Sequence, residues 1–582
     1  KIAVQLKPQF FEAWIAWGNT LLQLGHVHEE QHYFLEAREK YEKAIELSAS
    51  QEILGELYWD YAVVWMMISR FSGEALDLHL ALQNFDNALK FLKSPLPEFW
   101  HDRATTYLEL GLLLNDQGHF LQAAETFQRA VEQRPSFIEG WLSLATTYSQ
   151  LYLNSMDERF ALRASSSYAK AVSLEENNGE ALLGWAQLLA ETGKLNRNEK
   201  ALEASVEKCK KAASIDPEDT AVIAQLIESL SALGAMTGKL ELLTEAEQKI
   251  TLATEQFPAE PDLWYAYGLC LMAFARYFED PEHDYSAIEK LQHGLSLDRT
   301  NAEIWHALAL AHKHAADLTD EEVMIERAAR FFAKAMDLKP NCPSLSYDTA
   351  SAFLHYSETF DDLSALEYAI ALFESLFQTH QLVLLHHPEW LFEYAAAIEW
   401  LGDYTGEEKD FLRSIDLFSH VLLINPDHPS VHFRMAENYV QIGHLTGESE
   451  AYKKAIHSFR LASRQDEENP LIWLSWSLAL IHLGNRTIDE QLKNQLYLDA
   501  EQKIFRAGRL GHPSSHYHLA SLYSLLGRTT EAMALIQKAL ASRSLPPLED
   551  MLADEWLEPL RSTSEFASFL QDLEAKLEAR EQ

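Results

Sequence analysis

The chain has 582 residues, of which 88 are acidic and 48 are basic, so its formal net charge is −40. A chain with this excess of negative charge does not follow a phosphate backbone unless its few bases gather on one face, which argues against a nucleic-acid partner. Apolar residues make up 47% and charged residues 23%, the balance of an ordinary folded protein. No run of 18 apolar residues occurs, so no membrane span is predicted.

The cysteines and the first residues add two expectations. Cys209, Cys270 and Cys342 are far apart and form no C-x-x-C pair, which argues against a disulfide framework and fits a reducing, cytoplasmic location. The chain begins with Lys1 rather than Met, and residues 1–8 (KIAVQLKP) read as a helix tail that ends at a proline. We expect residues 1–8 to be the remnant of an upstream repeat, so that any targeting signal or catalytic domain would precede them.

A repeat occupies residues 9–545. An aromatic or apolar residue opens most of the predicted first helices, and seven of the twelve successive spacings between the opening positions are 41 residues. Such a fixed period predicts a solenoid of stacked helical units. The opening positions are Trp14, Tyr58, Tyr107, Trp141, Leu182, Ile223, Trp264, Trp305, Ser346, Leu391, His432, Trp473 and His516.

Small residues follow the opening positions and predict close helix packing. Four residues after the opening position stands Gly or Ala in most units, as in Gly18, Ala145, Gly268 and Ala309. Later in each unit a second small residue is followed by a bulky one at helical spacing. Small side chains opposite bulky ones let two antiparallel helices approach each other closely.

This pattern resembles the tetratricopeptide repeat family. The unit Tyr107 to Pro135 (YLELGLLLNDQGHFLQAAETFQRAVEQRP) is close to the 34-residue form of that family, and so is the unit that starts near His516. The resemblance implies an all-α superhelix of about thirteen helix-turn-helix repeats, with the first helices on the concave face.

Most units are seven residues longer than the family's usual repeat. The two small sites of a unit lie 19 residues apart in most units but 12 apart in the two short ones, which places the extra residues around the hairpin turn. Thr-Gly pairs at 192–193, 237–238, 405–406 and 446–447 mark that turn. Because the apolar spacing continues beyond it, we predict added helix rather than a long loop.

Residues 546–582 form a different closing segment. After Leu545-Pro546-Pro547, the pattern of Trp556, Pro559, Leu560, Arg561 and Phe566 resembles the segment that closes many bacterial arrays of this family. We predict a cap in which Trp556, Leu560, Phe566 and Leu570 cover the last apolar face, followed by a charged helix.

One enzymatic motif occurs in the sequence. His28-Glu29-Glu30-Gln31-His32 reads H-E-x-x-H, which on a helix would offer two imidazoles to zinc and Glu29 as a base. The segment is polar, lies in a hairpin insert and has no third ligand, so a zinc-dependent hydrolase is a remote alternative. Without another catalytic set, we predict a protein that is not an enzyme and needs no cofactor or metal.

Two columns of residues describe the predicted concave groove. The residue after each opening position is mostly apolar or aromatic, which suits anchors for a partner or core packing between repeats. Acids at the predicted helix starts suit a rim that attracts bases, or helix ends that complement the dipole. The predicted groove residues are Trp59, Leu142, Leu183, Tyr265, His306, Tyr347, Phe392, Phe433, Leu474 and Tyr517, and the acidic rim is Glu12, Glu56, Glu139, Glu180, Asp262, Glu303 and Glu389.

These columns contain no Lys, Arg or Asn, with Lys313 the nearest exception, so we do not expect a groove that grips acidic peptides. We predict a protein-interaction scaffold or chaperone-like adaptor that binds an apolar or amphipathic segment with basic flanks. The alternative is a regulatory array of a larger enzyme whose catalytic domain lies upstream. The sequence does not indicate an oligomeric state.

Overall fold

The computed structural model describes residues 1–48, 51–340, 342–379 and 387–581, and every regular element among them is a helix. The chain divides into two compact units. Unit 1 comprises Lys1–Asp362 and Ser375–Val383, and unit 2 comprises Leu363–Glu374 and Leu384–Gln582.

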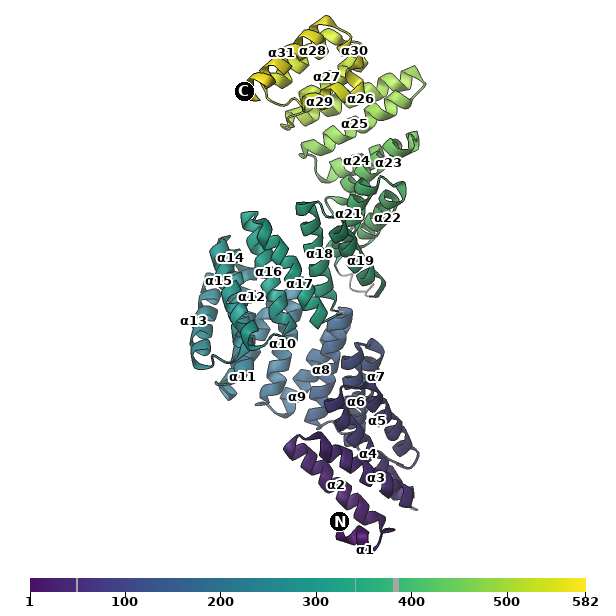
Figure 1. Cartoon of the computed structure of the whole chain (residues 1–582), viewed down its shortest axis with the longest axis vertical. Coiled ribbons are helices and arrows are strands. Elements are labelled where there is room, and N and C mark those ends of the chain that lie inside the picture. Colours follow the sequence, from purple (N-terminus) through teal and green to yellow (C-terminus); the bar gives the residue numbers. More distant parts are fainter. Residues whose placement is uncertain (49–50, 341, 380–386, 582) are drawn as a thin grey trace. The chain divides into compact units, whose positions relative to one another are not determined.

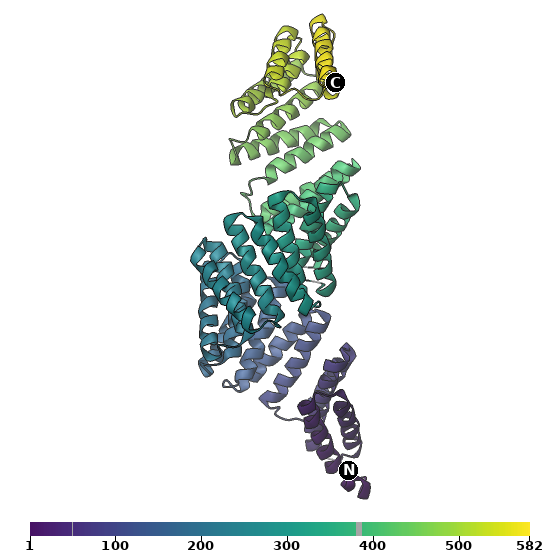
Figure 2. The same cartoon turned by 60° about the vertical axis from the view of Figure 1, so that its left-hand side comes forward.

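Unit 1 begins with the short helix α1 (Ile2–Leu6) and continues as eight helical hairpins and one further helix, α18 (Pro343–Phe360). In Figures 1 and 2 these helices follow one another in chain order, each beside the one before. The hairpins are α2 (Phe11–His28) with α3 (Gln31–Leu47), α4 (Gln51–Ser72) with α5 (Ala75–Leu89), α6 (Pro97–Leu114) with α7 (Gln117–Gln133), α8 (Ile138–Ser155) with α9 (Glu158–Leu174), α10 (Gly179–Leu195) with α11 (Glu199–Ile215), α12 (Thr220–Thr237) with α13 (Leu240–Gln256), α14 (Pro261–Phe278) with α15 (Pro281–Leu297), and α16 (Ala302–Thr319) with α17 (Glu322–Leu338).

Unit 2 contains four hairpins and a closing segment. Most of α19 (Leu363–Thr379) also belongs to unit 2. The hairpins are α21 (Pro388–Thr405) with α22 (Glu408–Ile424), α23 (Val431–Thr446) with α24 (Ser449–Gln465), α25 (Pro470–Arg486) with α26 (Glu490–Arg509), and α27 (Ser515–Leu525) with α28 (Thr529–Ala541). The closing segment is α29 (Leu548–Ala553), the short helix η1 (Glu555–Leu557), α30 (Glu558–Arg561) and α31 (Ser564–Glu581).

The small-residue column is buried between the helices of each hairpin, as the sequence predicts. Ala145, Ala309 and Ala436 are fully buried, and a Cβ added to Gly268 would lie 2.5 Å from Leu291 of α15. The all-α architecture of stacked antiparallel hairpins predicted from the sequence is therefore confirmed within each unit.

The extra residues of the long repeats are helix, as predicted. In a long hairpin such as α8 with α9, the helices have 18 and 17 residues and are joined by Met156 and Asp157 alone. In the short hairpin α27 with α28 they have 11 and 13 residues. The inserts thus lengthen both helices and leave the connecting turn short.

Three of the four Thr-Gly turns are in place. Gly238, Gly406 and Gly447 each end a first helix in the left-handed conformation, which favours glycine. The prediction for Thr192-Gly193 is wrong, since both residues lie inside α10. Gly193 is needed for close packing instead, because a Cβ there would lie 2.6 Å from Leu202 of α11.

The predicted register of the unit at Tyr107 is also wrong. Its first helix, α6, begins at Pro97, so the residue that corresponds to Trp14 and Trp141, the fourth of its helix, is Trp100. The hairpin is therefore as long as its neighbours, because its first helix begins before the 34-residue pattern does. With Trp100 as its opening position, the spacings to Tyr58 and Trp141 become 42 and 41 residues (100 − 58 and 141 − 100).

The closing segment packs on the last hairpin. Leu560 and Phe566 are fully buried in a core shared with α25 to α28, and Trp556 and Leu570 pack against that core while remaining partly exposed. The segment therefore supplies the apolar contacts that a following repeat would otherwise make.

One helix among the described residues, α12, is apolar and long enough to cross a membrane by composition and length. More than half of it is buried against its neighbours in the stack, as expected for a core helix.

Candidate partner-binding groove

The H-E-x-x-H segment does not form the helix that a zinc site requires. His28 is the last residue of α2, Glu29 takes the left-handed conformation, and His32 lies in the first turn of α3. Its two histidines are therefore not one turn apart on a single helix, and the zinc-hydrolase alternative is wrong. No group of three or more His, Cys, Asp or Glu residues that could hold a metal occurs among the described residues.

The inner side of unit 1 contains a hollow of about 910 Å³. Its walls come from the first helices α6, α8, α10, α12, α14 and α16, together with the end of α17 and the start of α18. The residues that line the hollow lie in the last turn of α6, in the middle of α12 and in the first turns of α16 and α18. First helices therefore face the hollow in unit 1, as the repeat pattern implies.

One wall of this hollow is apolar. Leu112, Leu113 and Leu114 at the end of α6 line it and are 54%, 46% and 47% exposed. Leu153 and Met156, at the end of α8, continue the wall. Contiguous exposed apolar side chains, unlike single scattered ones, call for a functional explanation.

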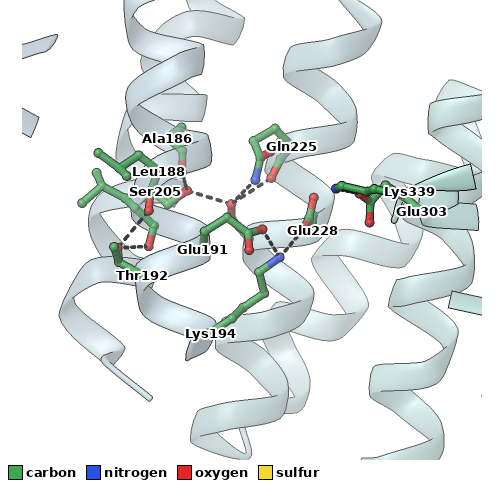
Figure 3. A network of polar contacts seen from close by, with 12 residues as sticks. Ala186, Leu188, Glu191, Thr192, Lys194, Ser205, Gln225, Glu228, Glu303 and Lys339 are labelled. Carbon is green, nitrogen blue, oxygen red and sulfur yellow. Dashed lines mark hydrogen bonds and ion pairs between the residues drawn. The ribbon is translucent and has the colours of Figure 1, made fainter. Parts of the chain in front are cut away.

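Polar residues also line the hollow, and Figure 3 shows the contacts among several of them. The Lys194 ammonium of α10 lies 2.5 Å from a Glu191 carboxylate oxygen and 2.6 Å from one of Glu228 on α12. A second pair joins Lys339, which follows α17, to Glu303 of α16 at 2.5 Å. Each of these lysines bridges two different elements of the stack.

A buried hydrogen-bond network connects α10, α11 and α12 near Lys194. The Ser205 hydroxyl of α11 donates to the Ala186 carbonyl oxygen of α10 at 2.7 Å and lies 2.8 Å from the Ser229 hydroxyl of α12. The buried Gln225 amide donates to Ser229 at 3.3 Å and lines the hollow. The network fixes α10 against α12, the two helices that carry Glu191 and Glu228.

The ionisation states of these groups follow from their surroundings. Burial by itself lowers the pKa of Lys194, but Glu228 and Glu191 outweigh burial and hold that pKa well above its usual value. Glu303 is exposed but partly desolvated by its neighbours, which by itself would raise its pKa; Lys339 outweighs this effect, and the pKa of Glu303 is lowered. The pKa of the Tyr265 hydroxyl is raised well above its usual value, chiefly by burial. At neutral pH Lys194 and Glu303 are therefore charged, and the neutral Tyr265 hydroxyl can donate.

The expectation that the groove lacks bases is wrong for this hollow. Lys194, Arg276 and Lys339 line it, beside Glu191, Glu228 and Glu303. The two lysines are already held by carboxylates, whereas Arg276 is exposed and makes no ion pair or hydrogen bond within the part of the chain that the structure describes. The sequence columns missed these residues because they lie farther along the first helices or after a second helix.

The predicted groove residues differ in their accessibility. Tyr265 and His306 line the hollow, and the His306 imidazole lies 2.8 Å from the Asp348 carboxylate of α18. Trp59, Leu142, Leu183, Tyr347, Phe392 and Phe433 are partly exposed on their first helices. Leu474 and Tyr517 are buried, and the Tyr517 hydroxyl donates to Asp554 of the closing segment at 2.8 Å. These two side chains therefore serve the core of unit 2.

The seven predicted rim residues are all exposed. Glu303 pairs with Lys339, and Glu389 lies 3.2 Å from the imidazole of His428. Six of the seven lie in the first turn of a helix, where a carboxylate also complements the helix dipole. Glu56 is the exception, since α4 begins at Gln51.

The residues that the two columns missed occupy recurring positions. Glu228 stands five residues after the opening position Ile223, Glu191 stands nine after Leu182, and Lys194 and Arg276 each stand twelve after theirs. Reading every third or fourth position along the first helix, instead of one position, would have found them, because such positions share a face.

Comparison with known proteins finds a family match in two of the hairpins. The sequence model of the Tetratricopeptide repeat family matches residues 104–137, which cover most of α6 and α7, and residues 513–544, which cover α27 and α28. No curated protein matches the chain.

Three solved structures show how far the likeness in fold extends. The human IFIT1 dimer with m7Gppp-AAAA is 16% identical with a TM-score of 0.42, over 81% of this chain and 93% of that one. The Cut9–Hcn1 hetero-tetramer of APC/C is 14% identical with a TM-score of 0.37, over 91% and 96%. A tetratricopeptide repeat protein from Parabacteroides merdae is 14% identical with a TM-score of 0.37, over 51% and 98%. Likenesses at these scores say nothing about what this chain binds.

Proposed function

Because this chain is a tetratricopeptide repeat protein, we propose that it is a non-enzymatic scaffold that holds a partner polypeptide in the hollow of unit 1. The observation that carries the proposal is the exposed wall of Leu112, Leu113 and Leu114 beside a polar centre. An apolar wall supplies affinity for a partner, and polar groups beside it fix the partner's register.

The partner we propose is an apolar or amphipathic segment with basic flanks. The chain's net charge of −40 attracts a basic partner over a distance of about one Debye length, roughly 8–10 Å at physiological salt. Exposed acids such as Glu139, Glu180 and Asp262 stand at the starts of α8, α10 and α14, which also contribute to the hollow. Three unpaired cysteines suit such a scaffold to a reducing compartment, and we place it in the cytoplasm.

Substitution of the leucine wall tests this function. We expect the triple variant L112Q/L113Q/L114Q to lose most of the partner captured by the wild-type protein, because these three leucines are exposed apolar side chains that line the hollow. The matched control is L162Q/L252Q, which changes two exposed leucines on the second helices α9 and α13. Capture is measured by affinity purification and mass spectrometry, with circular dichroism to show that each variant is folded.

Two results would contradict the proposal. One is equal capture by the wall variant and the control variant, since the hollow would then play no part. The other is a captured molecule that nuclease removes, because the partner would then be a nucleic acid.

A further inference from the structure

Two carboxylates in the hollow share one cation that comes from the chain itself. Lys194 extends from the last turn of α10 and touches both Glu191, on the same helix, and Glu228, on the next first helix. Figure 3 shows its ammonium between the two carboxylates. The pair Glu191 and Glu228 would be a doubly negative site without it.

Lys194 covers a carboxylate that is less accessible than itself. The Glu228 side chain is 16% exposed, the Lys194 side chain 34% and the Glu191 side chain 38%, so the lysine lies on the solvent side of Glu228, while Glu191 is as accessible as the lysine. A lysine side chain is a single charge on a flexible stem, and it can swing into solvent without disturbing the backbone. The helices that carry the two carboxylates are held together without Lys194, because Gln225 and Ser229 of α12 connect to α10 through Ser205.

We propose that Lys194 is an internal competitor that occupies, in the free protein, the place of a basic side chain of the partner. This inference rests on the proposed function and identifies the group that the partner's basic flank contacts. Binding exchanges one cation for another between Glu191 and Glu228, and the displaced Lys194 moves into solvent. An arginine of the partner fits the site better than a lysine, since its planar guanidinium has five donors and can make two parallel hydrogen bonds to one carboxylate.

Selectivity follows from the exchange. A neutral segment cannot replace Lys194 without leaving two carboxylates unpaired in a partly buried site, which is costly. A neutral segment therefore leaves Lys194 in place and gains little from its removal, whereas a basic side chain competes with Lys194 for the two carboxylates.

The test measures peptide binding to the full chain by fluorescence anisotropy. The probe is a fluorescein-labelled peptide of leucine and alanine flanked by arginines, and the same peptide with citrulline in place of arginine serves as its neutral counterpart. We expect Lys194→Met to tighten binding of the arginine peptide about tenfold and to change binding of the citrulline peptide much less. Glu228→Gln in the wild-type background should weaken the arginine peptide.

The matched control is Lys210→Met. Lys210 of α11 pairs with Glu245 of α13 at 3.3 Å, so it also bridges two helices of neighbouring units, but on second helices outside the hollow. It changes the net charge of the chain equally, and we expect it to leave the affinity for the arginine peptide within about twofold of wild type. Thermal unfolding of both variants separates a loss of stability from a change in binding.

The outcomes separate this inference from the proposed function. If Lys194→Met leaves the affinity for the arginine peptide unchanged or weakens it, the inference is overturned, because Lys194 then supports binding or plays no part. If the leucine-wall variant binds the same peptide as tightly as wild type, the proposed function fails whatever Lys194→Met does. A gain in affinity of equal size for Lys210→Met would also overturn the inference, since the effect would then be one of net charge.

Discussion

Single residues set how closely paired helices approach. Gly268 in α14 shows this best, because a Cβ at that position would lie 2.5 Å from Leu291. We expect Gly268→Ala to lower the free energy of unfolding by about 1–3 kcal/mol, the usual cost of overpacking a core. Gly179→Ala is the control, since a Cβ there meets nothing within 4 Å at the start of α10. Urea unfolding followed by circular dichroism measures both, and equal midpoints would show that this contact does not limit packing.

Histidines make the stability of unit 2 depend on pH. Burial is the main cause that lowers the pKa of His482 to about 4, and it likewise lowers the pKa of His518 to about 4. His482 lies 3.2 Å from His444 and packs on Trp556 of the closing segment. The ordinary pKa of histidine is near 6.5, so the unfolded chain binds protons before the folded one does. Stability that is present above about pH 6.5 is therefore lost as the pH falls toward 4.

Hydrogen exchange measured between pH 7 and pH 4 tests this effect. After correction for the intrinsic exchange rate, protection of α25 and of the closing segment should fall as the pH is lowered. His482→Gln, which cannot titrate, should make the fall shallower. A fall of the same size in this variant would assign the pH dependence to other groups.

At the scale of helices, the sequence predicts the hairpins and misplaces one of them by two turns. Trp100 and Tyr107 are seven residues apart, so they lie on the same face of α6, and either one satisfies the repeat pattern. Gly111 also fits the small-residue position of the repeat pattern by spacing, although it packs against Phe120 at a different position of the hairpin. Only the observed start of the helix at Pro97 decides between the two registers.

The candidate site was harder to predict than the fold for a physical reason. Whether the small residues are buried depends on the packing of a single hairpin, and the spacing of residues within one repeat is enough to predict that packing. The hollow depends on how successive hairpins rotate, so the lining moves from the end of α6 to the start of α16. Only some residues of the predicted groove column, such as Tyr265 and His306, therefore line the hollow. Lys194 and Glu228 also line it but lie outside that column. The division into two compact units was not predicted either.

The closing segment is the element that stabilises the last hairpin. Phe566 of α31 is fully buried in the core that includes α27 and α28. We expect Phe566→Ala to cost about 3–5 kcal/mol in that core and to raise hydrogen exchange in α27 and α28. Leu552→Ala, an exposed position in α29, is the control. Unchanged exchange in α27 and α28 would show that they are stable without the closing segment.

At the scale of the whole molecule, stability is local because helices contact mainly their neighbours in the chain. Ala309 of α16 is fully buried against α17, so Ala309→Phe forces the two helices apart. We expect hydrogen exchange to rise in α14 to α17 while the hairpins α23 to α26 of unit 2 keep their protection. A uniform rise along the chain would instead indicate a single cooperative unit.

The central claim is that the hollow of unit 1 holds a polypeptide. A photo-crosslinking amino acid at Gln187, an exposed residue of α10 that lines the hollow, tests this claim most directly in cells. The same group at Leu252, which is exposed on α13, reports the background. The account predicts a crosslinked polypeptide from Gln187 that is absent from Leu252. Equal adducts at both positions, or an adduct at Gln187 that contains RNA, would contradict it.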